Sequence, residues 1–181
     1  MTTEYLLDRE VEHVLAALMP SNALACQVSI HTGLRIGDVL KLRHDQLKPR
    51  FWVTESKTGK RKLIGLPREL RDALELNWRA QGGGEWLFPG RDPRKHHTRQ
   101  AVWKDVKRAA EAFRLDQNVA PHSFRKVYAV DLMRHYGDID KVRRALNHEN
   151  ESVTMVYAMA AELLQAKHLR KVYRARKRVR R

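Results

Sequence analysis

The sequence predicts an α+β domain that is mainly helical and carries one small antiparallel β-hairpin. Apolar residues recur at helical spacing over most of the chain. Two short runs rich in β-branched and aromatic residues flank a Thr-Gly turn. A length of 181 residues suffices for one domain with a substantial core. We therefore expect a single domain over residues 1–166, followed by a basic tail over residues 167–181.

Three helices are expected before the hairpin. Apolar residues follow helical spacing from Asp8, a plausible N-cap, until Pro20 ends the pattern. A second helix, almost entirely apolar, is expected over residues 23–30. Gly33 then interrupts the pattern, and a third helix is expected to hold Arg35 in its first turn. Unpaired backbone N–H groups at a helix start favour anions, so this arginine suits an anion site.

The hairpin strands are expected over residues 51–56 and 61–66, on either side of the turn. After the hairpin, the pattern returns to helical spacing with Gly and Pro breaks between segments. The remaining helices are expected over residues 67–80, 100–113, from 121, 138–146, 151–159 and from 160.

The charge balance predicts a polyanionic partner. Lysine and arginine number 36 against 21 acidic residues, a net charge of +15, and nine of the 36 lie in the tail. Nucleic acid is the most common partner of such a chain. The single cysteine, Cys26, excludes an internal disulfide and a cysteine-based zinc site, and we expect it to be buried. Without a signal-peptide pattern or a long apolar run, the chain is expected to be cytoplasmic and nucleoid-associated in a bacterial, phage or archaeal-type host.

Residues suited to phosphate chemistry gather between positions 121 and 157. His122 and Arg125 form a His-x-x-Arg pattern on one helix face, His148 follows in a Leu-Asn-His pattern, and Tyr157 ends the segment. A guanidinium can bind phosphate oxygens as a planar fork, and an imidazole can donate a hydrogen bond or move a proton. A tyrosine hydroxyl becomes a useful nucleophile only beside such groups. The segment therefore favours attack on a phosphodiester.

These patterns, with two upstream segments, resemble the active site of the tyrosine recombinases, the phage integrase family. The segment HTGLRIGDVL from His31 is similar to the box that holds the family's first arginine, and SKTGK from Ser56 to its lysine-bearing hairpin. His-x-x-Arg, Leu-Asn-His and a tyrosine nine positions later complete the set. All five boxes occur in the family's order, so the resemblance implies the family's DNA breaking–rejoining catalytic fold.

The resemblance implies a role for each matching residue. Tyr157 would attack the scissile phosphate and form a 3′-phosphotyrosine, while Arg35 and Arg125 would hold its oxygens. His122 and His148 would donate hydrogen bonds or handle the proton of the nucleophile. The remaining assignments are Asp38 as a residue that orients catalytic side chains and Lys57 as the acid for the departing 5′ hydroxyl, with Lys60 as the other candidate. Because strand exchange conserves the phosphoester, no metal, ATP or other cofactor is implied.

Several points remain open at the level of sequence. For Arg35, a surface ion pair with Asp38 is the plain structural alternative. Asn147 and Lys126 differ from the family's usual glycine and histidine. Residues 1–30 are too few for the N-terminal DNA-binding domain of most relatives, so the chain is either a catalytic-domain fragment or a small recombinase.

The resemblance also implies a biological setting and leaves two rival functions. Double-stranded DNA would be the partner, with a dimer to tetramer of the chain assembled on it, in DNA recombination or integration by a phage or mobile element. The rivals are a type IB topoisomerase-like enzyme and a non-catalytic DNA-binding protein of the same fold.

Overall fold

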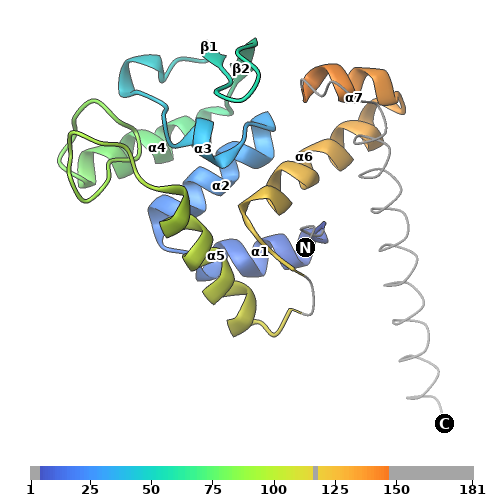
Figure 1. The fold of residues 1–181 in the computed structure, drawn as a ribbon, viewed down its shortest axis with the longest axis horizontal. Helices are drawn as coiled ribbons and strands as arrows, with labels where there is room; N and C mark the ends of the chain where they lie inside the picture. Colours follow the sequence, from blue (N-terminus) through green and yellow to red (C-terminus); the bar gives the residue numbers. More distant parts are fainter. Residues whose placement is uncertain (1–4, 116–117, 147–181) are drawn as a thin grey trace. The chain divides into compact units, whose positions relative to one another are not determined.

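A computed structural model describes residues 5–115 and 118–146 (Figure 1). The chain divides into two compact units, residues 1–128 and residues 129–181. No helix in the described part of the chain is long and apolar enough to cross a membrane. The helices are α1 (Asp8–Ala17), α2 (Pro20–Thr32), α3 (Ile36–Val39), the 3-10 helix η1 (His44–Gln46), α4 (Arg68–Ala80), α5 (Arg99–Ala112), α6 (Pro121–Tyr136) and α7 (Ile139–Ala145), and the strands are β1 (Arg50–Thr54) and β2 (Arg61–Gly65).

The predicted class, mainly helical with one antiparallel hairpin, is confirmed. Two details at the N-terminus are wrong in the prediction. Leu7, not Asp8, is the N-cap of α1, because the Glu10 carboxylate accepts a 2.8 Å hydrogen bond from the Leu7 backbone N–H and supplies the cap itself. Helix α1 ends at Ala17, before Pro20 as expected, but Pro20 itself begins α2, which the sequence pattern predicts from residue 23; at this first helical position a missing N–H costs nothing.

The first unit is a helical core with the hairpin beside α3 (Figure 1). Helix α2 packs against α1, α3 and α4, and α1 packs against α5. A buried carboxylate joins α2 to α5, because Asp105 Oδ2 accepts hydrogen bonds from Met19 N at 2.9 Å and Asn22 Nδ2 at 2.7 Å. Cys26 is buried in α2 as predicted, and its burial raises the pKa of the thiol. This core fixes the ends of α2 and α3, which carry the candidate site.

The two strands pair in an antiparallel register that sets Val53 opposite Lys62 and Thr54 opposite Arg61. Along β1, buried and exposed side chains alternate, with Phe51 and Val53 on the buried face. Directly opposed residues of an antiparallel pair lie on the same face, so Lys62 also points to the inner side of the hairpin.

In the second unit, the described residues 129–146 hold the C-terminal part of α6 and the short helix α7. Asp138 is the N-cap of α7, since its side chain accepts hydrogen bonds from the backbone N–H groups of Asp140 and Lys141.

Candidate active site

The turn between α2 and α3 is the base of the candidate site. Helix α2 ends at Gly33, whose positive φ of 67° is the left-handed conformation that glycine adopts readily. Ser29 Oγ donates to the Leu34 carbonyl at 2.7 Å, and Thr32 Oγ1 accepts from the Leu34 N–H at 3.2 Å. Arg35 follows directly as the N-cap of α3. Buried hydrogen bonds on both sides therefore hold the backbone that carries Arg35.

Glu55 joins the two arginines that the sequence predicts as phosphate ligands. Arg35 Nη1 donates to Glu55 Oε2 at 2.9 Å, and Arg125 Nη1 lies 3.6 Å from Glu55 Oε1. The Glu55 side chain is fully buried, and that of Arg125 is 1% exposed, whereas Arg35 keeps 25% exposure. Arg35 therefore pairs with Glu55 and not with Asp38, and the first unit brings Arg35 and Arg125 to the same carboxylate.

Burial and two cations act in opposite directions on Glu55. Burial raises the pKa of this carboxyl, but the guanidinium groups of Arg125 and Arg35 lower it by more than burial raises it. The pKa therefore lies below its ordinary value. The Thr58 hydroxyl also donates to Oε2, at 3.2 Å. Glu55 is therefore an ionised carboxylate held between two cations.

Lys62 places a third cation at the same turn. Its ammonium donates a hydrogen bond to the Thr32 carbonyl and lies 5.0 Å from the centroid of the Tyr128 ring. Burial lowers the pKa of Lys62 to about 8, and the charge of Arg125 lowers it too, while Glu55 opposes the shift. Arg125 donates to the next carbonyl, that of Gly33. Two cations thus bind consecutive carbonyls at the C-terminal end of α2, where the helix dipole favours positive charge.

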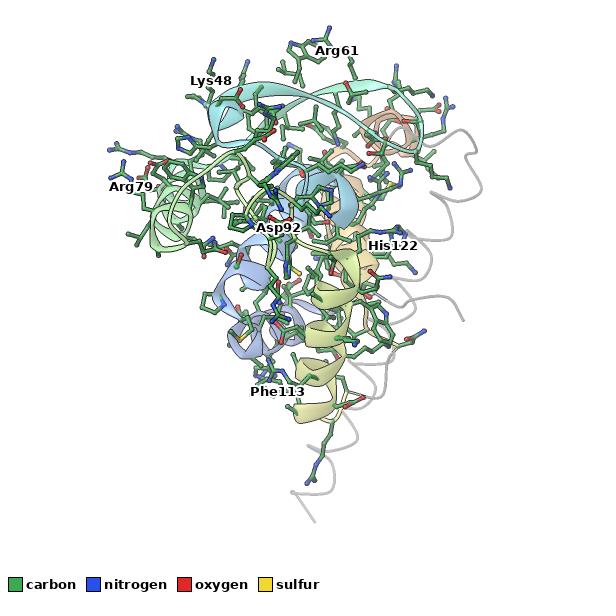
Figure 2. All side chains as sticks on the ribbon, turned by 60° about the vertical axis from the view of Figure 1, so that its left-hand side comes forward. Lys48, Arg61, Arg79, Asp92, Phe113 and His122 are labelled. Atoms are coloured by element: carbon green, nitrogen blue, oxygen red, sulfur yellow. The ribbon has the colours of Figure 1, made fainter. Side chains whose placement is uncertain are left out.

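His122, labelled in Figure 2, lies in the first turn of α6. Arg125 follows one turn later in the same helix. Partial removal from water, followed by the charges of Arg125, Lys126, Arg35 and Lys57, lowers the pKa of its imidazole to about 4. At neutral pH the ring is uncharged, and it can donate a hydrogen bond through one nitrogen and accept one through the other.

The hairpin turn carries Lys57, whose side chain is exposed. The buried Asp38 fixes the start of this turn, because its Oδ1 accepts a 2.9 Å hydrogen bond from the Ser56 N–H. The Asp38 carboxylate therefore binds the segment that carries the lysine, whereas its backbone N–H donates to the Arg35 carbonyl at 2.8 Å. On the outer face, Arg61 and Lys48 project away from the hairpin (Figure 2), and Arg61 Cζ lies 4.9 Å from the ring centroid of Trp52, which is 52% exposed.

Sequence reasoning missed two residues of this site, Glu55 and Lys62. Both had a signal in the alternation of the strands. Phe51 and Val53 mark the inner face of β1, and Glu55 continues that alternation as a charged residue on a buried face. Charged residues are almost never fully buried unless they are paired, so an acid at that position predicts a cationic partner.

The other two predicted catalytic residues, His148 and Tyr157, lie outside the described residues. Among the described residues, no group of three or more His, Cys, Asp or Glu side chains is placed to hold a metal ion.

In this mainly helical domain, two arginines from separate segments share one buried carboxylate beside a lysine-bearing hairpin, an arrangement suited to binding a phosphodiester. Comparison with known families agrees, since residues 4–163 match the phage integrase family. The chain belongs to the phage integrase family. It is 32% identical over 130 residues to the probable integrase/recombinase YoeC of Bacillus subtilis (strain 168), covering 71% of each chain. It is 28% identical to the tyrosine recombinase XerD of Caulobacter vibrioides, covering 88% of this chain and 60% of that one.

Solved structures share the fold at lower identity. The catalytic core of lambda integrase superposes with a TM-score of 0.66 at 20% identity, covering 80% of this chain and 91% of that one. The XerH recombinase in its post-cleavage complex with a palindromic difH substrate gives a TM-score of 0.71 at 19% identity, covering 84% of this chain and 48% of that one. A lambda integrase dimer bound to a COC′ core site gives 0.70 at 19% identity, covering 87% and 49%. The chain thus spans about half of these DNA-bound recombinases and most of the isolated core.

Proposed function

We propose that this chain cuts and rejoins double-stranded DNA at a specific site through a 3′-phosphotyrosine intermediate. The observation that carries the proposal is the arginine pair, in which Arg35 and Arg125 converge on one buried carboxylate. Two guanidinium groups held side by side by one carboxylate can bind the two non-bridging oxygens of a phosphodiester. Their charge offsets the negative charge that develops as the phosphate is attacked.

The proposed reaction begins when the Tyr157 hydroxyl attacks the scissile phosphorus and loses its proton. The bond from phosphorus to the 5′ oxygen breaks, and Lys57 donates a proton to the departing oxygen. His122 and His148 act on the phosphate oxygens or on the tyrosine proton, and the low pKa of His122 suits hydrogen bonding by a neutral ring. Attack by a 5′ hydroxyl of another strand reverses the step and releases the tyrosine.

The exposed surface of the hairpin is consistent with a DNA partner. Lys48 and Arg61 project outward there, and the Trp52 ring beside Arg61 is half exposed. Basic side chains neutralise backbone phosphates, and aromatic rings stack on sugars or bases. We further propose that residues 1–166 form the catalytic domain, that the basic tail over 167–181 contacts DNA or a neighbouring subunit, and that a dimer to tetramer assembles on DNA in the host cytoplasm.

Covalent trapping tests this function. A DNA site carrying a nick next to the scissile phosphate loses its short 5′-hydroxyl strand after cleavage, so the reaction cannot reverse and the adduct accumulates. We expect a gel-stable adduct with the wild-type chain and none with Tyr157→Phe, with a yield that neither EDTA nor ATP changes. An adduct in the Phe variant would show that another residue is the nucleophile. Relaxation of a plasmid without a defined site would favour the topoisomerase-like function, and DNA binding without any adduct would favour the non-catalytic one.

A modified leaving group tests Lys57. A 5′-bridging sulfur is a better leaving group than oxygen and needs no proton donor. We therefore expect Lys57→Ala to lose cleavage of the oxygen substrate by about 10²- to 10⁴-fold, the usual contribution of a general acid, and to recover it on the sulfur substrate. Lys60→Ala is the matched control, and a loss in that variant with the same recovery would assign the acid to Lys60.

A further inference from the structure

We propose that Glu55 is a positioning residue, whose buried carboxylate sets the separation of the Arg35 and Arg125 guanidinium groups and ties the lysine turn to them. The inference rests on the proposed function, because it concerns how the phosphate ligands are held. It adds a group that the five sequence boxes do not contain.

The two carboxylate oxygens of Glu55 serve different partners. Oε2 accepts from Arg35 Nη1 at 2.9 Å and from Thr58 Oγ1 at 3.2 Å. Oε1 lies 3.6 Å from Arg125 Nη1. The carboxylate thus contacts the Nη1 atom of both guanidinium groups. Each guanidinium keeps further N–H donors on its other nitrogens. The arrangement fixes one corner of each fork and leaves the Arg35 side chain with 25% exposure to solvent.

Glu55 is itself held firmly by the hairpin. Its backbone N–H donates to the Lys60 carbonyl at 3.0 Å, and its carbonyl accepts from the Gly59 N–H at 2.8 Å. Lys57 lies inside the loop that these two bonds close. The side chain is fully buried, so the carboxylate is part of the packed interior of the first unit. Glu55 therefore fixes the hairpin turn that carries Lys57 and the two arginines relative to each other.

Charge gives a second reason for the carboxylate. Arg35, Arg125 and Lys62 bring three cations to one turn, and like charges at short range repel each other. An anion in their midst makes the cluster stable in the absence of DNA. In the opposite role, the Glu55 carboxylate would occupy the phosphate position and compete with DNA for the two arginines. It would then have to leave its fully buried position when DNA binds. These two roles predict opposite effects of its removal, because a positioning anion speeds cleavage and a competing anion slows it.

The test compares Glu55→Gln with Glu75→Gln on the nicked substrate. Glu75 is the matched control because its carboxylate, half-buried on α4, also has two basic partners, His44 and Arg79. We expect Glu55→Gln to slow adduct formation at saturating DNA by about 10- to 100-fold, as for a small misplacement of reacting groups. The noncovalent dissociation constant should stay within about threefold of the wild type or become tighter, since the variant gains net positive charge. Cleavage by Glu55→Gln at or above the wild-type rate would overturn the proposal.

Nuclear magnetic resonance of the arginine side chains separates this inference from the proposed function. In the wild type, the paired Nη–H groups of Arg35 and Arg125 should rotate slowly and give resolved signals, and in Glu55→Gln these signals should merge. The Lys62 ammonium should lose its proton at lower pH in the same variant, because Glu55 opposes the lowering of its pKa. If the wild type forms no adduct, the proposed function fails, and these signals still decide the role of Glu55. Unchanged arginine signals and an unchanged Lys62 titration would overturn it.

A folding defect in Glu55→Gln would call for Glu55→Asp, which keeps the negative charge but shortens the side chain by one methylene. We expect the Asp variant to fold with the Lys62 titration closer to wild type than any neutral variant, and to cleave more slowly than wild type because its carboxylate cannot reach both arginines. Wild-type cleavage by Glu55→Asp would overturn the proposal.

Discussion

The guanidinium of Arg125 donates a hydrogen bond to the backbone carbonyl of Gly33, two residues before Arg35 in the sequence. The Tyr128 ring, one turn further along α6, lies against the same glycine. Helix α6 therefore contacts the turn that carries the other arginine through a charged group and an aromatic ring. The position of Arg35 depends on α6 as well as on its own helix.

Gly33→Ala should destabilise the chain more than the same change at Gly59. Both glycines have φ of 67°, but a Cβ at Gly33 would overlap the Tyr128 ring, whereas nothing lies within 4 Å of a Cβ at Gly59. The left-handed conformation alone costs about 1–2 kcal/mol for alanine, and overpacking adds about 1–3 kcal/mol. Urea unfolding of both variants measures the difference. Equal losses would show that the contact with Tyr128 does not constrain the turn.

Lys62 should make stability depend on pH in an alkaline window. Its folded pKa of about 8 lies below the ordinary 10.5, so between these values the unfolded chain binds a proton that the folded chain does not. The free energy of unfolding therefore rises with pH across this window. The stability that the lowered Lys62 pKa supplies at high pH is lost as pH falls towards 8. Lys62→Met should remove up to about 3 kcal/mol of this dependence. Denaturant unfolding of both chains between pH 7 and 10.5 checks it, and parallel curves would contradict a depressed Lys62 pKa.

His122 should stay neutral well below the ordinary pH of histidine titration. Its pKa is lowered to about 4 from 6.5, so the unfolded chain binds this proton first and the contribution of His122 to stability is lost as pH falls from 6.5 through 4. Titration of the imidazole by nuclear magnetic resonance, assigned with His122→Gln, should give a midpoint near 4. Lys57→Ala should raise that midpoint because it removes one of the nearby cations. A wild-type midpoint near 6.5 would contradict the combined effect of burial and the cation cluster on this imidazole.

Asp38 should act on cleavage through the Ser56 backbone. Asp38→Asn retains an oxygen that can accept from the Ser56 N–H, whereas Asp38→Ala leaves that group without its acceptor. We expect the Ala variant to lose about 1–3 kcal/mol of stability, the cost of an unsatisfied buried donor, and to cleave DNA more slowly because the Lys57 turn is released. The Asn variant should keep most of the stability and most of the cleavage rate of the wild type. Equal cleavage rates of the Ala variant and the wild type, measured below their unfolding temperatures, would remove Asp38 from this role.

The order of helices and strands followed from the sequence because local rules govern it. Helical spacing, the Thr-Gly turn and the glycine after α2 are each decided within a few residues, and the structure confirms the elements they predict up to residue 146, with shifts of a few residues at their ends. The helices predicted over 151–159 and from 160 lie outside the described residues. The same local reasoning misplaced the cap of α1, because the Glu10 carboxylate accepts from the Leu7 N–H and the N-cap position itself carries no capping side chain.

The sequence by itself determined the catalytic family of the chain, since ordered motifs carry that information, and it predicts Arg35 and Arg125 as phosphate ligands. Only the tertiary structure decided that Glu55 is the partner of both arginines and that Lys62 joins them at the end of α2. The reason is physical: the partner of a buried charge is set by packing between segments 20 to 92 residues apart, and no local pattern encodes which distant side chain arrives there.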